Sequence, residues 1–396
     1  MSAEILLLFL LLVIAAALLN GGFAFTVLYL FLGIYVVSVF WVGRMARNLS
    51  CKRSYETRVF CGEEIPVRLE IENRGWLPVP WLYLQESLPS ELAAGLGLKR
   101  LLSLGPHGRQ VITYTLHAYK RGYYSLGPLA ARFGEPVGLS DWREAGMPAG
   151  QITVYPRIVP ITDLQLPSRS PLGTLRHHQP IFADPTRVRG KRPYVAGDSL
   201  RHIDWKTSAG SGSLQVKQFE PSIALQTVLF LDLNRNGYPR RHGIDASELS
   251  IVIAASLANW VITKKQSVGL VTNGSDPLSG GHSIPPLPAR KGKAQLIQVL
   301  DLLARLQCAD STPLAELIGR ESANLPWGTT VAVITGQANE ALFDQIFQMK
   351  RHGLQVVLIL AGRVTGLQHI RQQAERFGVP LHAFASEKSI EIWRSK

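Results

Sequence analysis

The pattern of hydrophobic and polar positions changes along the chain and divides it into four stretches. Two apolar runs come first, residues 5–19 and residues 23–42, and neither carries a charged side chain. The second run has the roughly 20 residues that span a bilayer, and the first reaches that length with its flanking residues. An Asn-Gly-Gly turn at residues 20–22 separates them. The pattern predicts a two-helix transmembrane hairpin over residues 1–45.

The charges beside this hairpin predict its orientation. Positive side chains follow the second run at Arg44, Arg47, Lys52 and Arg53. Because positive flanks of a span stay on the cytoplasmic side, both ends of the hairpin are expected there. We therefore expect a multi-pass protein of the cell (inner, cytoplasmic) membrane that contacts lipid through two helices and holds its soluble domains in the cytoplasm. A secretory signal peptide is the alternative for the first run, but residues 1–4 lack a positive side chain.

Residues 46–160 have the pattern of short strands. Residues 67–72 alternate apolar and charged side chains, which is the period of a half-buried strand. Further strands are expected at residues 81–86, 110–117, 122–127 and 152–155. Short strands between Pro/Gly turns are typical of a sandwich of roughly immunoglobulin-like type. This β-sandwich-like domain carries no cluster of catalytic residue types, so we expect it to act in spacing or protein contact.

Residues 161–222 are predicted to form a connector and then a segment of dense, alternating charge. This charged segment extends from Arg187 to Glu220. Bulky side chains such as Ile203 and Trp205 distinguish this segment from a flexible linker. Its charges favour ion pairs that lock it in place or dock a partner. The candidate interaction residues are Tyr194, Gly197, Asp198, Arg201, Asp204, Trp205, Lys206 and Glu220. The alternative is a metal-dependent hydrolase that uses Asp198, His202 and Asp204, but no nucleophile elbow or phosphate-binding loop accompanies them.

From residue 223 to residue 396 the pattern becomes strand–helix alternation. Strands are expected at residues 228–231, 268–271, 330–335, 355–360 and 381–384, and helices at residues 248–264, 293–307, 340–351 and 367–377, with a shorter helix from residue 313. Continuous apolar strands that alternate with helices predict a doubly wound, Rossmann-type α/β domain. Such domains bind ligands at the carboxyl ends of their strands.

Candidate metal ligands follow the first of these strands. Asp232, Asn234 and Asn236 occupy alternate positions of one loop, where oxygen side chains can converge on a hard cation such as Mg²⁺. The pattern resembles the Asp-x-Ser-x-Ser motif of the metal-ion-dependent adhesion site in von Willebrand factor A domains, with asparagine at both serine positions. The resemblance implies a threonine from a later loop, for which Thr312 is the candidate.

The resemblance also implies an aspartate after the fourth strand, where residues 335–337 are Thr-Gly-Gln. With Asp232 as the only placed carboxylate, Mg²⁺ is expected to bind weakly, and no other cofactor is indicated. The alternative is that Asp232 and the two asparagines cap the loop and the turn that follows it.

Composition narrows the classes of partner. The chain has 42 Lys and Arg against 29 Asp and Glu, a formal charge of +13. A basic excess suits anionic lipid or nucleic acid. Without a block of Lys/Arg or a basic-aromatic repeat, a solvated basic surface is favoured, although membrane-proximal nucleic-acid binding stays an alternative. Cys51, Cys61 and Cys308 form no C-x-x-C pair, so neither a zinc site nor a disulfide framework is indicated.

The charged segment resembles a family of bacterial and archaeal membrane proteins known as domain of unknown function 58. The matching pattern is Y-x-x-G-D-x-x-R-x-I-D-W-K-x-S-A from Tyr194 to Ala209, followed by L-x-V-K-x-F-E from Leu214 to Glu220. A second block, K-R-G-Y-Y-x-L-G-P, starts at Lys120. The resemblance implies a von Willebrand A-like C-terminal domain and a MoxR-type AAA+ ATPase as partner. It implies no established biochemical role.

These observations together lead to one main hypothesis. The protein is expected to be a non-enzymatic, membrane-anchored adaptor that acts with the AAA+ ATPase in the assembly or remodelling of a protein complex. Docking is expected through the strand-end face around Asp232 and Thr312, supported by the charged segment.

Overall fold

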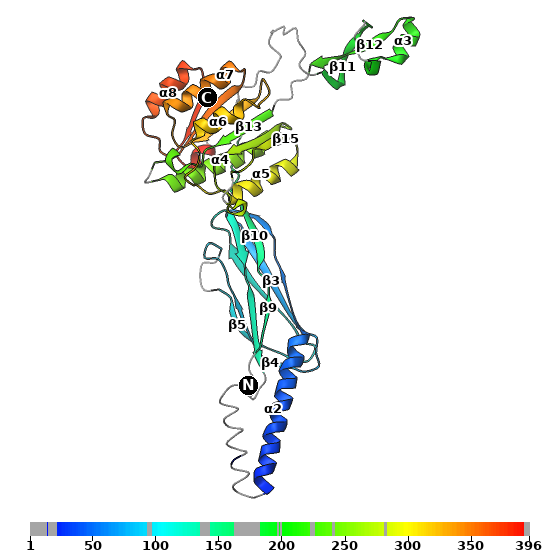
Figure 1. Cartoon of the computed structure of the whole chain (residues 1–396), viewed down its shortest axis with the longest axis vertical. Helices are drawn as coiled ribbons and strands as arrows, with labels where there is room; N and C mark the ends of the chain where they lie inside the picture. Colours follow the sequence, from blue (N-terminus) through cyan, green and yellow to red (C-terminus); the bar gives the residue numbers. More distant parts are fainter. Residues whose placement is uncertain are drawn as a thin grey trace. The chain divides into compact units, whose positions relative to one another are not determined.

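The computed structural model describes residue 14 and residues 22–92, 97–134, 143–161, 183–195, 198, 200–221, 226–239, 242–280 and 283–391. The chain forms two compact units (Figure 1). The first comprises Met1–Arg157 with Leu303–Arg305, and the second comprises Ile158–Leu302 with Leu306–Lys396. The apolar helix and the β-rich part belong to the first unit, and the charged segment and the α/β part belong to the second.

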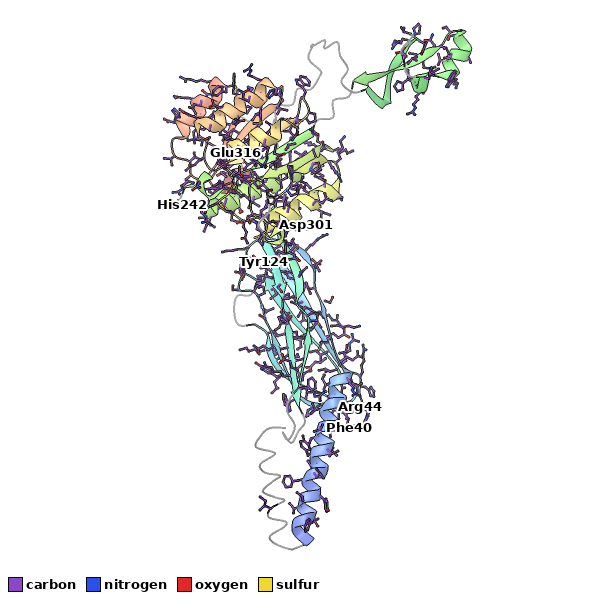
Figure 2. All side chains as sticks on the ribbon, in the orientation of Figure 1. Phe40, Arg44, Tyr124, His242, Asp301 and Glu316 are labelled. Carbon is purple, nitrogen blue, oxygen red and sulfur yellow. The ribbon has the colours of Figure 1, made fainter. Side chains whose placement is uncertain are left out.

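Helix α2 (Gly22–Asn48) corresponds to the second predicted span. Its part from Phe25 to Asn48 is long and apolar enough to cross a membrane. Large apolar side chains such as Leu30 and Phe40 are exposed along it, and Figure 2 shows Phe40 one turn before Arg44. The first predicted span lies outside the described residues, apart from Ile14. The chain therefore has an apolar N-terminal helix whose length and composition suit a membrane.

A second helix passes the same test of length and hydropathy. Helix α4 (Gly243–Thr263) is 72% buried over its apolar window, whereas the window in α2 is 11% buried. Because the side chains of α4 pack inside the protein, its hydropathy reflects a core position. Of these two helices, only α2 has the exposed apolar surface that lipid would cover.

The strands of the first unit form three sheets. The sheet orders are β1-β3-β6, β2-β10-β7 and β5-β4-β8-β9, and every pairing is antiparallel except β2 with β10. The strands are β1 (Leu49–Ser54), β2 (Arg58–Phe60), β3 (Glu64–Asn73), β4 (Val79–Glu86), β5 (Lys99–Leu104), β6 (Arg109–His117), β7 (Gly122–Leu126), β8 (Leu129–Gly134), β9 (Arg143–Met147) and β10 (Gly150–Tyr155). All the strands expected between residues 67 and 155 are present.

Strand β3 shows how these three sheets, which we call the sandwich below, share buried apolar side chains. Its side chains Ile65, Val67, Leu69 and Ile71 are fully buried and alternate with residues that are more exposed, so one face of the strand supplies the core. Leu69 and Ile71 join the cluster of β4 and β8, and Ile65 and Val67 join the cluster of β7 and β10. One strand thus packs against both of the other sheets.

The sandwich also holds a buried ion pair. Arg53 Nη2 lies 2.6 Å from Glu86 Oε1, and both side chains are inaccessible to solvent. Tyr114 donates its hydroxyl hydrogen to Glu86, and Arg53 Nη1 donates to the Leu126 carbonyl oxygen at 2.9 Å. Burial, followed by the contact with Glu86, raises the pKa of Tyr114. Leu126 belongs to the K-R-G-Y-Y-x-L-G-P block, which therefore contributes to this structural network.

The charged segment contains a β-hairpin. Strands β11 (Ala183–Pro193) and β12 (Gln215–Pro221) pair antiparallel, and η1 (Leu200–His202) and α3 (Trp205–Ser211) lie between them. The sequence pattern predicted a connector and a locked segment but not these strands. The part of the expected connector at residues 162–182 lies outside the described residues.

The second unit is built on a six-stranded sheet in the order β15-β14-β13-β16-β17-β18. All pairings are parallel except that of β15 with β14. The strands are β13 (Gln226–Leu231), β14 (Ser267–Thr272), β15 (Leu287–Arg290), β16 (Thr330–Thr335), β17 (Gln355–Ala361) and β18 (Leu381–Phe384). The remaining helices are η2 (Arg235–Gly237), η3 (Pro277–Ser279), α5 (Lys293–Arg305), α6 (Leu314–Ser322), α7 (Glu340–Arg351), α8 (Leu367–Arg376) and α9 (Glu387–Glu391).

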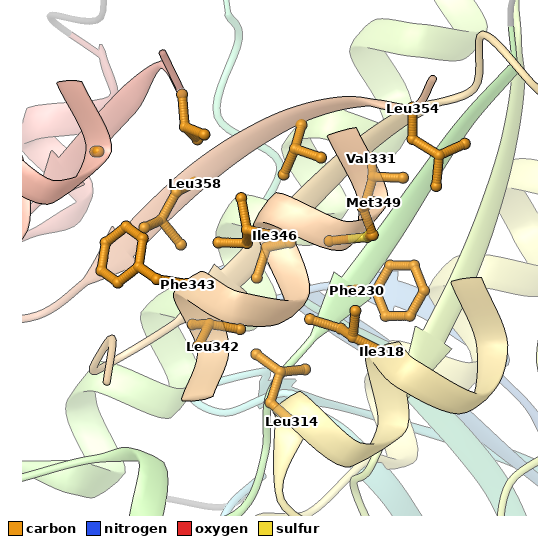
Figure 3. Packing of buried hydrophobic residues seen from close by; sticks show 14 of the residues in the cluster. Phe230, Leu314, Ile318, Val331, Leu342, Phe343, Ile346, Met349, Leu354 and Leu358 are labelled. Carbon is orange, nitrogen blue, oxygen red and sulfur yellow. The ribbon is translucent and has the colours of Figure 1, made fainter. Parts of the chain in front are cut away.

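Helices cover this sheet with apolar side chains. Ile318 of α6 and Ile346 of α7 are fully buried and form one cluster with Phe230 of β13 (Figure 3). Helix α4 packs against β13, β14, β16 and β17. Because the central strands are buried on both faces, they are the continuous apolar runs that the sequence pattern identified. The packing fixes the strand ends, where the candidate site lies.

Candidate functional site

Asp232 lies at the point where three parallel strands end. It directly follows β13, and its backbone N–H donates to the Ile334 carbonyl oxygen of β16 at 2.9 Å. Its Oδ1 accepts hydrogen bonds from the Asn234 N–H at 3.0 Å and from Asn273 Nδ2 at 2.9 Å. Its Oδ2 accepts from the Thr335 hydroxyl at 2.8 Å. The carboxylate therefore ties together the ends of β13, β14 and β16.

Burial determines the electrostatics of this carboxylate. Asp232 is 3% exposed, and the loss of hydration raises its pKa, although the hydrogen bonds from Asn273, Asn234 and Thr335 act in the opposite direction. Burial also raises the pKa of the nearby Cys308 thiol, and the charge of Asp232 adds to the effect. The raised pKa favours the thiol over the thiolate that acts as a nucleophile, although the charge of Arg235 acts in the opposite direction.

A tyrosine and two glycines complete the surroundings of Asp232. The buried Tyr238 donates its hydroxyl hydrogen to the Asp232 carbonyl oxygen. A Cβ atom at Gly237 would lie 2.4 Å from Asp232 Oδ2, and one at Gly336 would lie 2.3 Å from the Tyr238 ring. Both positions therefore need glycine because a side chain would overlap the network. The close packing leaves the carboxylate in one fixed arrangement.

The loop that contains Thr312 lies beside Asp232. The Asn234 side chain donates to the Ser311 carbonyl oxygen, and Asn273 Nδ2 donates to the Thr312 carbonyl oxygen at 2.9 Å. Asn234 Oδ1 accepts from the Asn236 N–H at 2.9 Å, and the Asn236 side chain is exposed. The structure thus brings Asp232, Asn234 and the Thr312 loop together and leaves the Asn236 side chain in solvent.

The arrangement fits a Mg²⁺ site poorly. Both oxygens of Asp232 and the side-chain oxygen of Asn234 already accept hydrogen bonds from protein donors. Ser311 Oγ is buried without a hydrogen-bond partner, but one hydroxyl beside a fully engaged carboxylate falls short of the six ligands that Mg²⁺ requires. No group of three or more His, Cys, Asp or Glu that could hold a metal occurs within the described ranges. The network therefore favours the loop-capping alternative, and weak Mg²⁺ binding stays a prediction.

Asp198 of the charged segment is held by an arginine. Arg192 Nη1 and Nη2 each lie 2.7 Å from one oxygen of Asp198, a bidentate ion pair. The same carboxylate accepts from the Val195 N–H at 3.0 Å. The contact with Arg192 lowers the pKa of Asp198. Asp198 thus fixes the turn that follows β11.

Asp204 begins helix α3 and is held by a lysine. Its Oδ1 accepts from the Thr207 N–H at 3.1 Å, and its Oδ2 lies 2.9 Å from Lys191 Nζ. The contact with Lys191, followed by that with Thr207, lowers the pKa of Asp204 to about 2. Ser208 Oγ donates to the Asp204 carbonyl oxygen at 2.8 Å and accepts from the Gln215 N–H at 2.9 Å. Asp204 therefore joins α3 to both strands of the hairpin.

Asp198 and Asp204 lie where they stabilise the shape of the β11–β12 hairpin. Each forms its own ion pair, and a carboxylate with a lowered pKa is a poor proton acceptor at neutral pH. His202 lies on the exposed η1. The side chains of Arg201, Trp205 and Lys206 are exposed, whereas that of Tyr194 is half-buried. Gly197 and the side chain of Glu220 lie outside the described residues.

Sequence reasoning missed three members of the strand-end network. Asn273 follows β14 in the way that Asp232 follows β13, and this position could have identified it. Thr335 ends β16 and was considered only as part of the Thr-Gly-Gln segment at residues 335–337, where the resemblance implied an aspartate. Tyr238 gave no signal, because a buried tyrosine that donates to a backbone carbonyl has no sequence pattern.

Known proteins match this chain at low sequence identity. The chain is 24% identical over 364 residues to the "Uncharacterized protein YeaD" of Bacillus subtilis, covering 88% of this chain and 85% of that protein. The CARDB domain of the PF1109 protein from Pyrococcus furiosus matches 27% of this chain and 86% of its own length, with 18% identity and a TM-score of 0.21. Proximal thread matrix protein 1 from the mussel byssus matches 43% of this chain and 46% of its own, with 11% identity and a TM-score of 0.32. Residues 190–360, from the hairpin to β17, match the family described as "Protein of unknown function DUF58".

Proposed function

We propose that this chain is a membrane-anchored adaptor that binds partner proteins and acts with a MoxR-type AAA+ ATPase in the assembly or remodelling of a protein complex. It has no catalytic role in this proposal. The N-terminal hairpin anchors the chain as a multi-pass protein of the cytoplasmic membrane, with the sandwich and the α/β unit in the cytoplasm. The α/β unit is proposed to be von Willebrand A-like.

The observation that carries the proposal is the pairing of charges in the β11–β12 hairpin. The acidic residues that a hydrolase would need, Asp198 and Asp204, are held separately by Arg192 and Lys191. Such pairs help to fix the shape of a segment, whose exposed side chains such as Trp205 can then contact another protein. The hairpin thus has the properties of a binding element.

The strand ends support a second contact. Asn236 and Asp310 are exposed beside the buried network of Asp232, on the loops that carry the candidate ligands. In open α/β sheets this edge is where ligands and partners bind. The internal hydrogen bonds around Asp232 hold those loops in place, so the face needs no metal to keep its shape. We define the strand-end face as Asn236, Asp310 and the Thr312 loop. We propose that this face and the β11–β12 hairpin bind the ATPase together.

The experiment is a binding measurement with defined components. The full chain in nanodiscs of neutral phosphatidylcholine is titrated with the purified MoxR-type ATPase of the same organism in the presence of ATP. Saturable binding by the wild type is expected. Asn236→Ala combined with Asp310→Ala should weaken it severalfold, and Asp344→Ala, an exposed aspartate of α7, is the matched control. Absence of binding by the wild-type chain would exclude the proposed partnership.

A further inference from the structure

The tip of the β11–β12 hairpin is a fixed scaffold. We define the hairpin tip as Tyr194, Val195, Asp198 and residues 200–214. The Tyr194 N–H donates to the Leu214 carbonyl oxygen at 2.8 Å and closes the base of the tip. Ile203 bridges to Val216, and these two side chains form its small buried core. Together with the ion pairs of Asp198 and Asp204, these contacts hold the backbone of the tip in place.

Large apolar side chains project from this scaffold into solvent. Single exposed apolar residues are common on protein surfaces, but several within one short segment indicate a surface that a partner covers. The exposed fractions are 60% for Val195, 66% for Leu200, 67% for Trp205 and 44% for Leu214. These side chains lie outside the small core that Ile203 and Val216 form.

The exposed charge of the tip is positive. Its two aspartates are neutralised by ion pairs with Arg192 and Lys191. Arg201 and Lys206 are exposed next to Leu200 and Trp205. The surface therefore combines apolar anchors with exposed basic groups, and a complementary surface is apolar at its centre and acidic around it.

We propose that the hairpin tip docks on an acidic protein surface, with the Trp205 indole in an apolar pocket of the partner. This inference rests on the proposed function, because it assigns the hairpin as the element that binds the ATPase. Tryptophan and arginine are the residue types that dominate binding energy at protein interfaces, and a fixed scaffold avoids the entropy cost of ordering a loop. An anionic membrane is less well matched, since electrostatic binding to lipid uses clusters of about four to eight basic residues.

The test extends the nanodisc titration with variants of the tip. Trp205→Ala should weaken binding of the ATPase by about tenfold or more, as expected for a central aromatic anchor. Arg201→Glu with Lys206→Glu should weaken it to a similar degree and reduce its dependence on salt concentration. Trp76→Ala removes a comparably exposed tryptophan from the first unit and should leave the affinity unchanged. Trp205→Phe should keep most of the affinity, and thermal melts of each variant check that the hairpin remains folded.

The outcomes separate the two proposals. No binding by the wild-type chain overturns both. Binding that is indifferent to the Trp205 and Arg201/Lys206 changes, yet lost with the Asn236/Asp310 changes, overturns the hairpin inference alone. Vesicles of phosphatidylglycerol serve as the lipid arm, with phosphatidylcholine vesicles as the control. If Trp205→Ala abolishes vesicle binding while ATPase binding persists, the tip is a lipid contact and the inference is overturned.

Discussion

At the scale of single residues, the strand-end network makes Asn273 more important than the predicted ligand Asn236. Asn273 Nδ2 donates to both Asp232 and Thr312, and its Oδ1 accepts from the Leu233 N–H at 2.6 Å. Asn273→Ala removes these bonds and leaves buried groups unsatisfied, so we expect a loss of about 1–3 kcal/mol in the free energy of unfolding. Urea unfolding of the full chain in micelles measures it.

The control for this change is Asn236→Ala. The Asn236 side chain is exposed, and only its backbone N–H takes part in the network. We expect no measurable change in the free energy of unfolding. If Mg²⁺ raised the unfolding midpoint of the wild type but not that of Asn236→Ala, the metal hypothesis would replace the hydrogen-bonded network described here.

The low pKa of Asp204 predicts how the hairpin responds to acid. The pKa is lowered from 3.8 to about 2 by Lys191 and the Thr207 N–H. A carboxyl whose pKa is lower in the folded state stabilises that state above its unfolded pKa, and the stabilisation is lost as the pH falls through the folded value. The hairpin should therefore lose protection between about pH 4 and pH 2. Hydrogen exchange at the Thr207 and Gln215 amides, corrected for intrinsic rates, measures this protection.

Lys191→Met supplies the comparison. It removes the larger cause of the lowered pKa, so the loss of protection should be smaller than in the wild type and should end at a higher pH. Identical pH profiles for the two proteins would show that the Asp204–Lys191 contact contributes nothing to the hairpin in solution.

At the scale of elements, the buried pair of Arg53 and Glu86 joins β1 to β4 inside the sandwich. Replacing one partner leaves the other charge buried and unpaired, which typically costs about 3–5 kcal/mol. Glu86→Gln should therefore destabilise the first unit strongly, whereas Arg53→Met with Glu86→Leu should cost much less. Denaturant unfolding of the full chain in micelles compares them.

The exposed pair of Arg74 and Glu72 is the matched control for this prediction. Because surface pairs contribute about 1 kcal/mol or less, Arg74→Ala should have little effect on the unfolding midpoint. Equal effects of Glu86→Gln and Arg74→Ala would contradict the structural role assigned to the buried pair.

The elements also show how far the sequence could predict this fold. Strand β16 and helix α7 match their predicted bounds, because buried parallel strands are continuous apolar runs and the asparagine at residue 339 caps α7. Strand β15 was missed because it is a short edge strand that contains Pro288. Strands β11 and β12 were missed because their sequences are dense in charged residues and lack a regular apolar alternation.

The candidate site was predictable to a similar extent. Asp232 was predicted at the carboxyl end of a parallel strand, where such sheets bind ligands, and Thr312 was named because the resemblance to the adhesion site implies a threonine from a later loop. The hydrogen bonds that the two Asp232 oxygens accept could not be predicted. They depend on the side-chain conformations of Asn273 and Thr335, which sequence spacing does not determine.

At the scale of the whole molecule, the exposed apolar surface of α2 bears on its attachment to a membrane. The side chains of Leu30, Val36 and Phe40 are exposed, whereas Val42 and Met45 are buried in the core of the sandwich. A chain that begins at residue 41 should therefore be soluble and keep its fold. A chain that begins at residue 49 loses two core side chains, each worth about 1.5–3 kcal/mol when buried.

Carbonate extraction and thermal unfolding test these two truncations against the full chain. The full chain should stay in the membrane fraction, and both truncated chains should leave it. The chain from residue 41 should melt at a higher temperature than the chain from residue 49. Equal melting temperatures would show that the end of α2 does not belong to the sandwich core.

The burial of Val42 and Met45 has a mechanical consequence. Trp41 Nε1 donates to the Pro78 carbonyl oxygen at 3.0 Å, and β1 begins at Leu49, directly after the helix ends at Asn48. The helix therefore continues directly into the sandwich, without a flexible linker between Asn48 and Leu49. For a chain anchored as proposed, the tilt of the helix in the bilayer and the direction of the sandwich are a single variable. A partner that changes the direction of the sandwich would therefore also change the tilt of the helix in the bilayer.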